Sequence, residues 1–404
     1  MNIVVISKYA PVPGYGSNPR WFELGKRISA QGHCFEIITS DSNHGSNFRV
    51  CKGRMTTFEI DLVKFTVIKT LKYKKTASVR RVLSWFDFDY RLFRYKRYIS
   101  PDVVIISSLS LTSILFGLYL KFFKKAKLVF EIRDIWPLTL IEEGRYSRFH
   151  PLYCFLRLIE ICGYKNADLI VGTMPNLKQH VIDSRIRKSD KCFHSCGIGV
   201  DPDRAKPVPK YKFSALVEDK IKYKKIIGYC GSIGLTNNLH SFIRYIKCTS
   251  APDVYFIIAG DGAERTVYEK ELSKAENVMF LGHIEPKDVQ RFLRRCDILF
   301  LATMPSRVWE YGQSMNKVVD YMLAAKFIIA QYEGFSSMID EADCGLFTTG
   351  ERLHECLDYA LKLSADERNK RGINGRRWIL RHQNYDYLSE QYMDKIKQIY
   401  KMAT

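Results

Sequence analysis

The sequence predicts an α/β protein built from two Rossmann-like domains, and three observations support this prediction. Short apolar runs alternate with helical patterns from the N-terminus onward, which is typical of a parallel, doubly wound sheet. The alternation starts again after a stretch rich in Pro and Lys at residues 201–212. At 404 residues, the chain is also longer than one hydrophobic core usually serves.

The expected strands are short β-branched apolar runs, and the expected helices carry apolar residues at helical spacing. In the first domain the strands are residues 3–7, 35–39, 103–107, 128–131 and 169–172, with a helix over 18–30. In the second domain the strands are residues 226–229, 255–259, 278–281, 298–301 and 327–330.

The domain boundaries follow from the same pattern. We expect a first domain over 1–200, a linker over 201–223, a second domain over 224–380 and a C-terminal helix over 381–404 that packs back on the first domain. The two sheets are expected to face each other across a cleft, with the carboxyl ends of both sets of strands at the ligand site.

Composition excludes several classes of protein. A hydrophobic content of 46% with 26% charged residues is ordinary for a globular chain. The eleven cysteines contain no CxxC pair, which indicates neither a disulfide framework nor a zinc site. Cys192, His194 and Cys196 also lack the spacing of a tetrahedral metal set. The N-terminus reads as a strand without a signal peptide, so we expect a reducing, cytoplasmic location.

The net charge of +20 indicates a partner of opposite sign. Much of it lies in residues 81–100 and 121–127, where Arg and Lys alternate with Trp, Phe and Tyr. Such a mixture suits the surface of an anionic membrane, but it also suits RNA or an ordinary basic helix. The apolar run over 111–123 is too short to span a bilayer.

One candidate ligand site lies in residues 310–330, "EYGQSMNKVVDYMLAAKFIIA". The apolar residues from 315 to 323 predict a helix, with Ser314 as its N-cap. Asn316, Lys317 and Asp320 lie off the apolar stripe in the first turns, where backbone N–H groups and the helix dipole favour an anion. The pattern predicts a phosphate site, although a solvated first turn would look similar.

Other loops at expected strand ends carry candidate site residues. Glu131, Arg133 and Asp134 end a buried strand, although Arg133 and Asp134 could simply pair with each other. The glycine pairs at such ends are Gly14 with Gly16, Gly231 with Gly234, and Gly260 with Gly262; His283 follows a further strand. None of these loops is a GxGxxG fingerprint, and Asp41 is a weak candidate for the acid of a dinucleotide fold, so a dehydrogenase is disfavoured.

Taken in order, "EIRDIWP", "GSIG", "IIAGDG", "FLGHI" and "SMNKVVDYMLAAKFIIA" resemble the retaining glycosyltransferases of family 4, which have the GT-B fold. The resemblance covers essentially the whole chain and extends to enzymes that build bacterial O-antigen and capsule, such as fucosamine transferases. It implies a nucleotide-sugar donor, with UDP favoured, in the second domain and a polyprenyl-diphosphate-linked saccharide acceptor on the first. It also implies no metal, no cofactor and no nucleic-acid partner, and a peripheral position on the inner face of the cell membrane.

The resemblance assigns roles to residues of this chain. The acid at Asp320 is expected to bind the ribose hydroxyls, and Lys317 to stabilise the leaving diphosphate. The full expected donor set is Gly231, Ser232, Gly234, Gly260, Gly262, His283, Ser314, Asn316, Lys317 and Asp320. Two departures matter: Gly312 stands where many relatives carry Glu, and Ser232 and Asn237 stand near the usual Arg and Lys.

On the first domain, Gly14 and Gly16 are the expected acceptor loop. Glu131, Arg133 and Asp134 are expected to orient the acceptor or to balance charge at the reacting centre. Two alternatives stay open: a GT-B sugar-nucleotide epimerase using Glu131, Asp134 and His283, and a basic nucleic-acid-binding protein.

Overall fold

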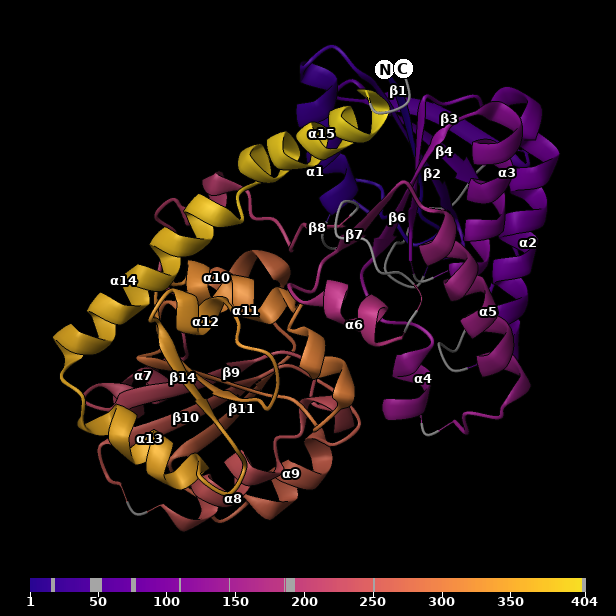
Figure 1. Cartoon of the computed structure of the whole chain (residues 1–404). Helices are drawn as coiled ribbons and strands as arrows, with labels where there is room; N and C mark the ends of the chain where they lie inside the picture. Colours follow the sequence, from indigo (N-terminus) through magenta and orange to yellow (C-terminus); the bar gives the residue numbers. More distant parts are fainter. Residues whose placement is uncertain are drawn as a thin grey trace. The chain divides into compact units, whose positions relative to one another are not determined.

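The computed structural model divides into two compact units (Figure 1). The described residues are 1–15, 19–43, 53–73, 78–108, 110–144, 146–184, 186, 193–249 and 251–401. The first unit is Met1–Gly199 with Tyr385–Thr404, and the second is Val200–Asn384. Residues 201–223, which their composition marks as a linker, belong to the second unit.

The first unit contains, within the described residues, an eight-stranded sheet in the order β3-β4-β2-β1-β5-β6-β7-β8. Neighbouring strands are parallel, apart from the antiparallel pair β3 and β4. The strands are β1 (Asn2–Ile6), β2 (Cys34–Ser40), β3 (Met55–Ile60), β4 (Val63–Ile68), β5 (Val103–Ser107), β6 (Lys127–Ile132), β7 (Leu169–Gly172) and β8 (Phe193–Ser195).

Helices cover both faces of this sheet, with α1 and α15 on one face and α3 and α5 on the other (Figure 1). The helices of the unit are α1 (Arg20–Ala30), α2 (Val79–Tyr95), α3 (Ile114–Lys124), α4 (Leu138–Glu142), α5 (Pro151–Asn166), α6 (Leu177–Asp183) and α15 (Tyr385–Lys401). Because both faces are covered, the central strands β5 and β7 are buried along their whole length.

The C-terminal helix α15 is part of the first unit's core. Tyr385, Leu388 and Tyr392 are buried in one cluster with the apolar residues of α1 and the sheet. Gly199 is required beside this helix, since a Cβ there would lie 2.3 Å from Tyr385 Cε1. The expected return of the last helix to the first domain is therefore confirmed.

The second unit contains, in the part of the chain that the structure describes, a parallel six-stranded sheet in the order β11-β10-β9-β12-β13-β14. Its strands are β9 (Lys225–Cys230), β10 (Val254–Ala259), β11 (Val278–Gly282), β12 (Ile298–Ala302), β13 (Phe327–Gln331) and β14 (Gly345–Thr348). Its helices are α7 (Ala215–Ile221), α8 (His240–Cys248), α9 (Arg265–Glu271), α10 (Pro286–Leu293), α11 (Asn316–Leu323), α12 (Met338–Glu341), α13 (Leu353–Lys362) and α14 (Ala365–His382).

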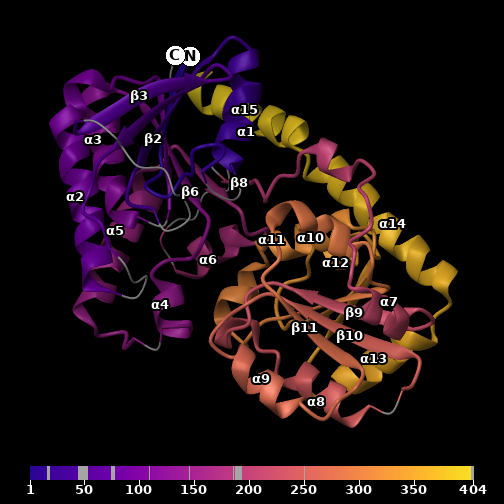
Figure 2. The ribbon, with the colours of Figure 1, turned by 180° about the vertical axis from the view of Figure 1, so that it is seen from behind.

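The helices of the second unit also form two layers. α8, α9 and α13 pack on one face of the sheet, where their apolar residues join the core of the strands, as Figure 2 shows from behind. α10, α11 and α14 lie over the other face. The α/β class and the two parallel, Rossmann-like sheets are as predicted.

Each sheet has one topological switch point, where the order of the strands reverses. In the first unit the chain runs outward from β1 through β2 and then returns to place β5 on the other side of β1. In the second unit β9 lies in the same way between β10 and β12. Ligands of open α/β sheets bind beyond the carboxyl ends of the strands at such points.

Candidate active site

Glycine loops stack on one another at the carboxyl edge of the second sheet. Gly231 N–H donates to Ala259 O (3.0 Å), and Gly260 N–H donates to Gly282 O (2.7 Å). A Cβ on Gly260 would lie 1.8 Å from Gly231 O, and one on Gly262 would lie 2.1 Å from Ile233 O. Gly260 and Gly262 are therefore positions of close backbone approach, which only glycine allows.

Lys317 extends from the first turn of α11 to the end of β9. Its ammonium donates to Tyr229 Oη (2.9 Å) and Asn237 Oδ1 (2.7 Å) and lies 4.5 Å from the centre of the Tyr229 ring. A Cβ on Gly231 would lie 2.6 Å from Lys317 Cε. Burial lowers the pKa of Lys317 to about 8. The structure thus brings together Lys317 and Gly231, two of the expected donor residues.

Tyr321 fixes the position of α11 across the switch point. Its hydroxyl accepts from Cys230 N–H (2.8 Å) and lies 3.1 Å from Phe300 O, so it joins the helix to β9 and β12. The side chain is 1% exposed. One turn earlier on the helix, Lys317 is thereby aimed at the end of β9.

The expected N-cap of this helix is wrong. Met315 occupies the N-cap position, and no side chain makes a capping hydrogen bond there. Ser314 is one residue too early, in the half-buried loop before the helix. The first backbone N–H groups of α11 therefore have no side-chain cap among the described residues, and such N–H groups are the ones that bind anions.

Asp320 lies one turn into the same helix and is bonded on both sides. Arg204 Nη2 donates to Asp320 Oδ1 (2.7 Å), and Gln290 Nε2 donates to the Asp320 carbonyl (2.9 Å). Burial raises the pKa of Asp320, and the neighbouring Arg204 opposes that rise. Asp320, the residue expected to bind the ribose, is thus held in place by the Arg204 guanidinium.

The other expected donor residues lie on the same loops with fewer contacts. Ser232 is exposed, and its carbonyl accepts from Tyr229 Oη (2.6 Å). Gly234 has open space around it, since the nearest atom to a Cβ there would be Ser232 Oγ at 3.9 Å. His283 is exposed directly after β11, and Asn316 is exposed as the first residue of α11.

In the first unit, Glu131 is fully buried and already bonded. Its carboxylate lies 3.2 Å from Arg20 Nη1 and accepts from Ser107 Oγ (3.3 Å) and Tyr392 Oη (3.4 Å). These contacts join α1, β5 and α15 to β6. Glu131 therefore stabilises the packing of these elements, and its role in catalysis stays a prediction.

Arg133 and Asp134 follow β6 at the sheet's carboxyl edge, as expected. Burial lowers the pKa of the Arg133 guanidinium, and nearby Arg20 adds to this effect. Burial raises the pKa of Asp134, which Arg133 opposes. Gly14 has a φ of +80° with open space beside it, while Gly16 lies outside the described residues.

Asp41 and Cys196, also noted in the sequence, make contacts that hold the fold together. Asp41 accepts from Thr70 N–H (2.9 Å) and pairs with Lys72 (2.8 Å). Cys196 Sγ is bonded to Arg20 (3.0 Å), and Cys192 lies outside the described residues. Across the described part of the chain, no group of three or more His, Cys, Asp or Glu side chains is placed to hold a metal.

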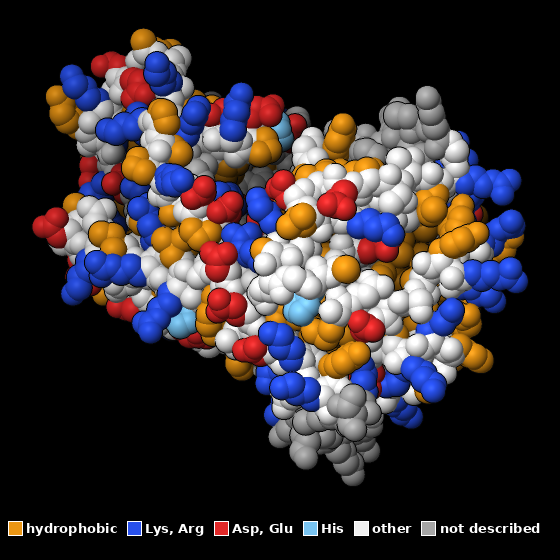
Figure 3. All heavy atoms as spheres, turned by 90° about the horizontal axis from the view of Figure 1, so that it is seen from above, with side chains coloured by type: hydrophobic (Ala, Val, Ile, Leu, Met, Phe, Trp, Pro, Cys, Tyr) orange, Lys and Arg blue, Asp and Glu red, His pale blue; other side chains and the backbone are white. Residues whose placement is uncertain are grey.

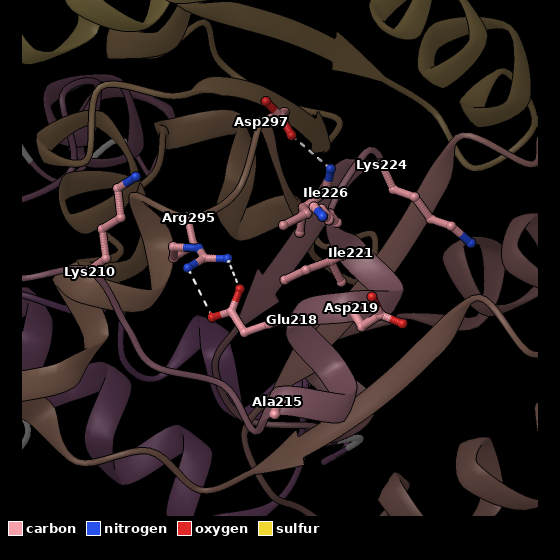
Figure 4. Close-up of a pocket in the computed structure, with 10 residues that line it drawn as sticks. Lys210, Ala215, Glu218, Asp219, Ile221, Lys224, Ile226, Arg295 and Asp297 are labelled. Atoms are coloured by element: carbon pink, nitrogen blue, oxygen red, sulfur yellow. Dashed lines mark hydrogen bonds and ion pairs between the residues drawn. The ribbon is translucent and has the colours of Figure 1, made fainter.

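A pocket of about 700 Å³ lies elsewhere in the second unit, at the amino ends of β9 and β12 (Figure 4). Ile226 and Asp297 line it, and Arg295 bonds both oxygens of Glu218 beside it. Because the glycine loops and Lys317 are at the opposite, carboxyl edge of the same strands, this pocket is not the candidate site.

Sequence reasoning missed four residues of the site: Tyr229, Tyr321, Arg204 and Gln290. The tyrosines lie within apolar runs, so the pattern marks them as core and gives no sign that their hydroxyls bond the loops. Arg204 and Gln290 are distant from Asp320 in the sequence. Their only available signal was polarity, which most surface residues share.

Comparison with known proteins places this site within a matched domain. Residues 224–366 match the family model described as "Glycosyl transferases group 1". That range contains the glycine loops, Lys317 and Asp320. No curated protein sequence matches the chain.

Solved structures match the fold over almost the whole chain. Trehalose-6-phosphate synthase OtsA has a TM-score of 0.74 at 14% identity, with 98% of this chain and 99% of that chain covered. Sucrose-phosphate synthase from Thermosynechococcus elongatus has a TM-score of 0.73 at 15% identity, with 99% of each chain covered. HepE of Anabaena, in complex with UDP and glucose, has a TM-score of 0.64 at 12% identity, with 98% of this chain and 100% of that chain covered.

At these identities the structural matches establish the fold, which is GT-B, and the family match identifies the domain. Residues 224–366 form a glycosyl transferases group 1 domain, and the protein is therefore a glycosyltransferase.

Proposed function

We propose that the protein is a retaining glycosyltransferase of family 4 that uses a UDP-sugar donor. The observation that carries the proposal is the meeting of Lys317, the Gly231 loop and the N-terminus of α11 at the switch point of the second sheet. A cation and a helix N-terminus without a side-chain cap at one point suit a diphosphate. HepE of Anabaena, a structural neighbour, is in complex with UDP-glucose in one structure, which supports UDP as the nucleotide.

The chemistry follows from this arrangement. When the bond from sugar to phosphate breaks, negative charge grows on the diphosphate, and the largest catalytic need is to stabilise it. Lys317 and the α11 dipole would do this, while Asp320 holds the ribose. The acceptor proton can pass to the departing phosphate oxygen, so no separate base is needed. Arg133 and Asp134 would orient the acceptor on the first unit.

The proposed acceptor is a polyprenyl-diphosphate-linked saccharide of bacterial O-antigen or capsule synthesis, reached from the cytoplasm at the inner face of the membrane. No described helix is long and apolar enough to cross a bilayer, so the enzyme would bind at the surface. Figure 3 shows exposed hydrophobic side chains among Lys and Arg on the right-hand side of the view. This mixture supports an anionic lipid surface as a partner.

The structure changes which residues would make that contact. Trp85, in the basic and aromatic stretch 81–100, cannot reach a membrane surface, because it is 2% exposed and donates its indole N–H to Tyr9 Oη (2.7 Å). The exposed apolar stripe of α2 is instead Val79, Leu83, Phe86 and Tyr90, spaced at i, i+4, i+7 and i+11 on one helix face. Phe155 of α5 extends it, with its ring 6.0 Å from that of Phe86.

A thermal-shift assay with UDP, GDP and dTDP tests the donor proposal. UDP should raise the melting temperature in the presence of EDTA, since protein groups replace a metal at the diphosphate. A ligand at 100 times its dissociation constant adds about 2.7 kcal/mol to the free energy of unfolding. A strict need for a divalent ion would overturn the proposed site. Tight binding of RNA that weakens steeply with salt, without any response to nucleotides, would favour the nucleic-acid alternative.

A further inference from the structure

The switch point of the first unit holds a buried cation and a buried carboxylate that the proposed chemistry does not use. Lys8 follows β1 and is 1% exposed, and Asp89 on α2 is 8% exposed. Hydroxyl side chains that follow β5 line the same point: Ser110, Thr112 and Ser113 are each 2% exposed. Unpaired charges in such surroundings are costly, so their presence requires an explanation.

Neither charged group is satisfied by its neighbours. The Lys8 ammonium has three donors, and within the described residues one of them bonds, to Ser42 O (2.9 Å). Asp89 Oδ1 accepts from Ser113 Oγ (2.6 Å), and the Thr112 hydroxyl also stabilises the carboxylate, whereas Oδ2 makes no hydrogen bond in the described part of the chain. The two groups influence each other's ionisation, yet no ion pair joins them in the described structure. Lys8 therefore keeps hydrogen-bond donors, and Asp89 one acceptor oxygen, for a further group.

The other charges nearby do not fill this role. Asp41 is paired with Lys72, and Asp87 with Arg91 (2.9 Å). Arg81 Nε donates to Tyr9 Oη (3.3 Å). Asp89 is thus the carboxylate here that keeps an unbonded oxygen within the described residues.

The opposite charges of Lys8 and Asp89 determine which kind of ligand can bind between them. A phosphate would meet the unbonded oxygen of Asp89, and an ammonium group would meet Lys8, so both are repelled. A neutral hydroxyl fits, because its oxygen accepts from Lys8 while its proton goes to Asp89 Oδ2. Aromatic rings also lie beside the ammonium, with the ring centres of Tyr9 and Tyr73 at 5.0 and 5.8 Å from Nζ, and hold it by cation–π contact.

We propose that Lys8 and Asp89 form a subsite for a neutral sugar unit of the acceptor, with one sugar hydroxyl bound between the ammonium and the carboxylate. The inference rests on the proposed function, since it takes a saccharide acceptor as given. It adds the two side chains that would recognise that saccharide. Both belong to the first unit, whereas the proposed UDP site belongs to the second. The subsite lies at the position where a parallel sheet binds its ligands.

The test uses the full chain saturated with UDP and titrated with neutral methyl glycosides of glucose, galactose, fucose and N-acetylglucosamine. Binding is followed by saturation-transfer NMR, with inorganic phosphate and methylamine as charged probes. At least one glycoside should bind, and neither charged probe should compete with it. Burial lowers the pKa of Lys8 to about 7 and raises that of Asp89 to about 6, so binding is measured at pH 6.5, where the ammonium and the carboxylate are both mostly charged. There Asp89→Asn and Lys8→Met should each weaken glycoside binding by about tenfold or more, because a charged hydrogen bond is lost, and should leave UDP binding unchanged.

Asp87→Asn is the matched control, since it removes the same charge from the same helix at a carboxylate whose two oxygens already bond Leu71 N–H (2.7 Å) and Arg91. It should keep the glycoside affinity. The melting temperature shows whether Asp89 binds the glycoside or only supports the fold. Burial raises the pKa of Asp89 to about 6, so the ionised side chain destabilises the folded protein at pH 7.5. Asp89→Asn should therefore keep or raise the melting temperature while glycoside binding falls.

Two results would overturn the subsite. One is equal glycoside affinity in Asp89→Asn and wild type. The other is a wild type that binds UDP and none of the glycosides, which would leave a trapped water as the occupant. If glycosides bind as described but no nucleotide does, the proposed donor chemistry fails and the subsite stands.

Discussion

Arg204 Nη2 lies 2.7 Å from Asp320 Oδ1, so the acid expected to bind the donor ribose is already paired with a cation from the segment after Val200. Burial raises the pKa of Asp320, and Arg204 keeps the carboxylate ionised and oriented. Within the described residues the hydrogen bond from Arg204 is made to Oδ1, which leaves Oδ2 for the ribose hydroxyls. The pair therefore looks like a prepared acceptor of two hydrogen bonds.

The first prediction concerns this pair. Asp320→Ala should weaken UDP binding by about 1–3 kcal/mol, because a charged acceptor of the ribose hydroxyls is lost. Arg204→Ala should weaken it less, because it removes only the group that positions Asp320. The double variant should match Asp320→Ala, as expected for coupled residues. Isothermal titration of UDP measures all three, and fully additive losses would show that Arg204 contacts the nucleotide by itself.

The second prediction concerns the protonation of Lys317. Its pKa in the folded protein is about 8, below the ordinary value of 10.5, so the ammonium is lost as pH rises through about 8. UDP affinity should fall over the same range, because a neutral amine cannot offset the charge of the diphosphate. Lys317→Met should bind UDP weakly and without this pH step. A step of equal size in the variant would assign the titration to another group.

Lys317 should matter still more in the transition state, because the charge on the diphosphate grows as the bond breaks. The third prediction is that Lys317→Ala lowers kcat more than it weakens donor binding. Steady-state kinetics beside UDP titration separates the two effects. No loss of kcat would point instead to Arg307, which begins the short 3₁₀ helix Arg307–Tyr311 after β12, as the partner of the diphosphate.

The fourth prediction concerns the stacked glycine loops. Gly260→Ala should lower the free energy of unfolding by about 3 kcal/mol or more, because its Cβ would lie 1.8 Å from the Gly231 carbonyl oxygen. Gly234→Ala in the adjoining loop should change it by about 0.5 kcal/mol or less, since no atom lies closer than 3.9 Å. Denaturant unfolding measures both, and similar values would contradict the close approach of the two loops.

Sequence patterns predicted the central strands well because those strands are apolar along both faces. Residues 103–107 and 169–172 are strands with the predicted bounds. The hairpin of β3 and β4 was missed because its strands are not continuous apolar runs like the other strands, and its turn uses Asp61 and Leu62 at positive φ. Turn prediction at such positions relies on Gly or Asn, which are absent here.

The candidate site was predictable only in part, for a similar reason. Glycines at strand ends and a basic residue in the first turn of a helix can be recognised locally, so the sequence alone was enough to propose Gly231, Gly260 and Lys317. Contacts between distant segments, such as Arg204 with Asp320 or Asp89 with the loop after β5, depend on how the chain folds back. No local pattern encodes these contacts.

The last prediction concerns the exposed face of α2 as a membrane contact. Leu83, Phe86 and Tyr90 are 52%, 43% and 60% exposed, and three exposed cations follow them in the sequence: Arg94, Lys96 and Arg97. Arg91 is excluded from this set because it pairs with Asp87 at 2.9 Å. If this face binds anionic lipid, apolar insertion and charge attraction should both contribute.

Co-sedimentation with vesicles of mixed phosphatidylglycerol and phosphatidylethanolamine tests this contact. Wild type should bind at low salt and release at high salt, since the surface potential is screened. Changing Arg94, Lys96 and Arg97 to Gln should release most of the bound protein, and changing Leu83 and Phe86 to Ser should weaken the part that survives high salt. Changing Lys220, Lys222 and Lys224 of the second unit to Gln removes equal charge and should leave binding intact. If that control releases the protein equally, only net charge drives the association, and α2 has no specific role in it.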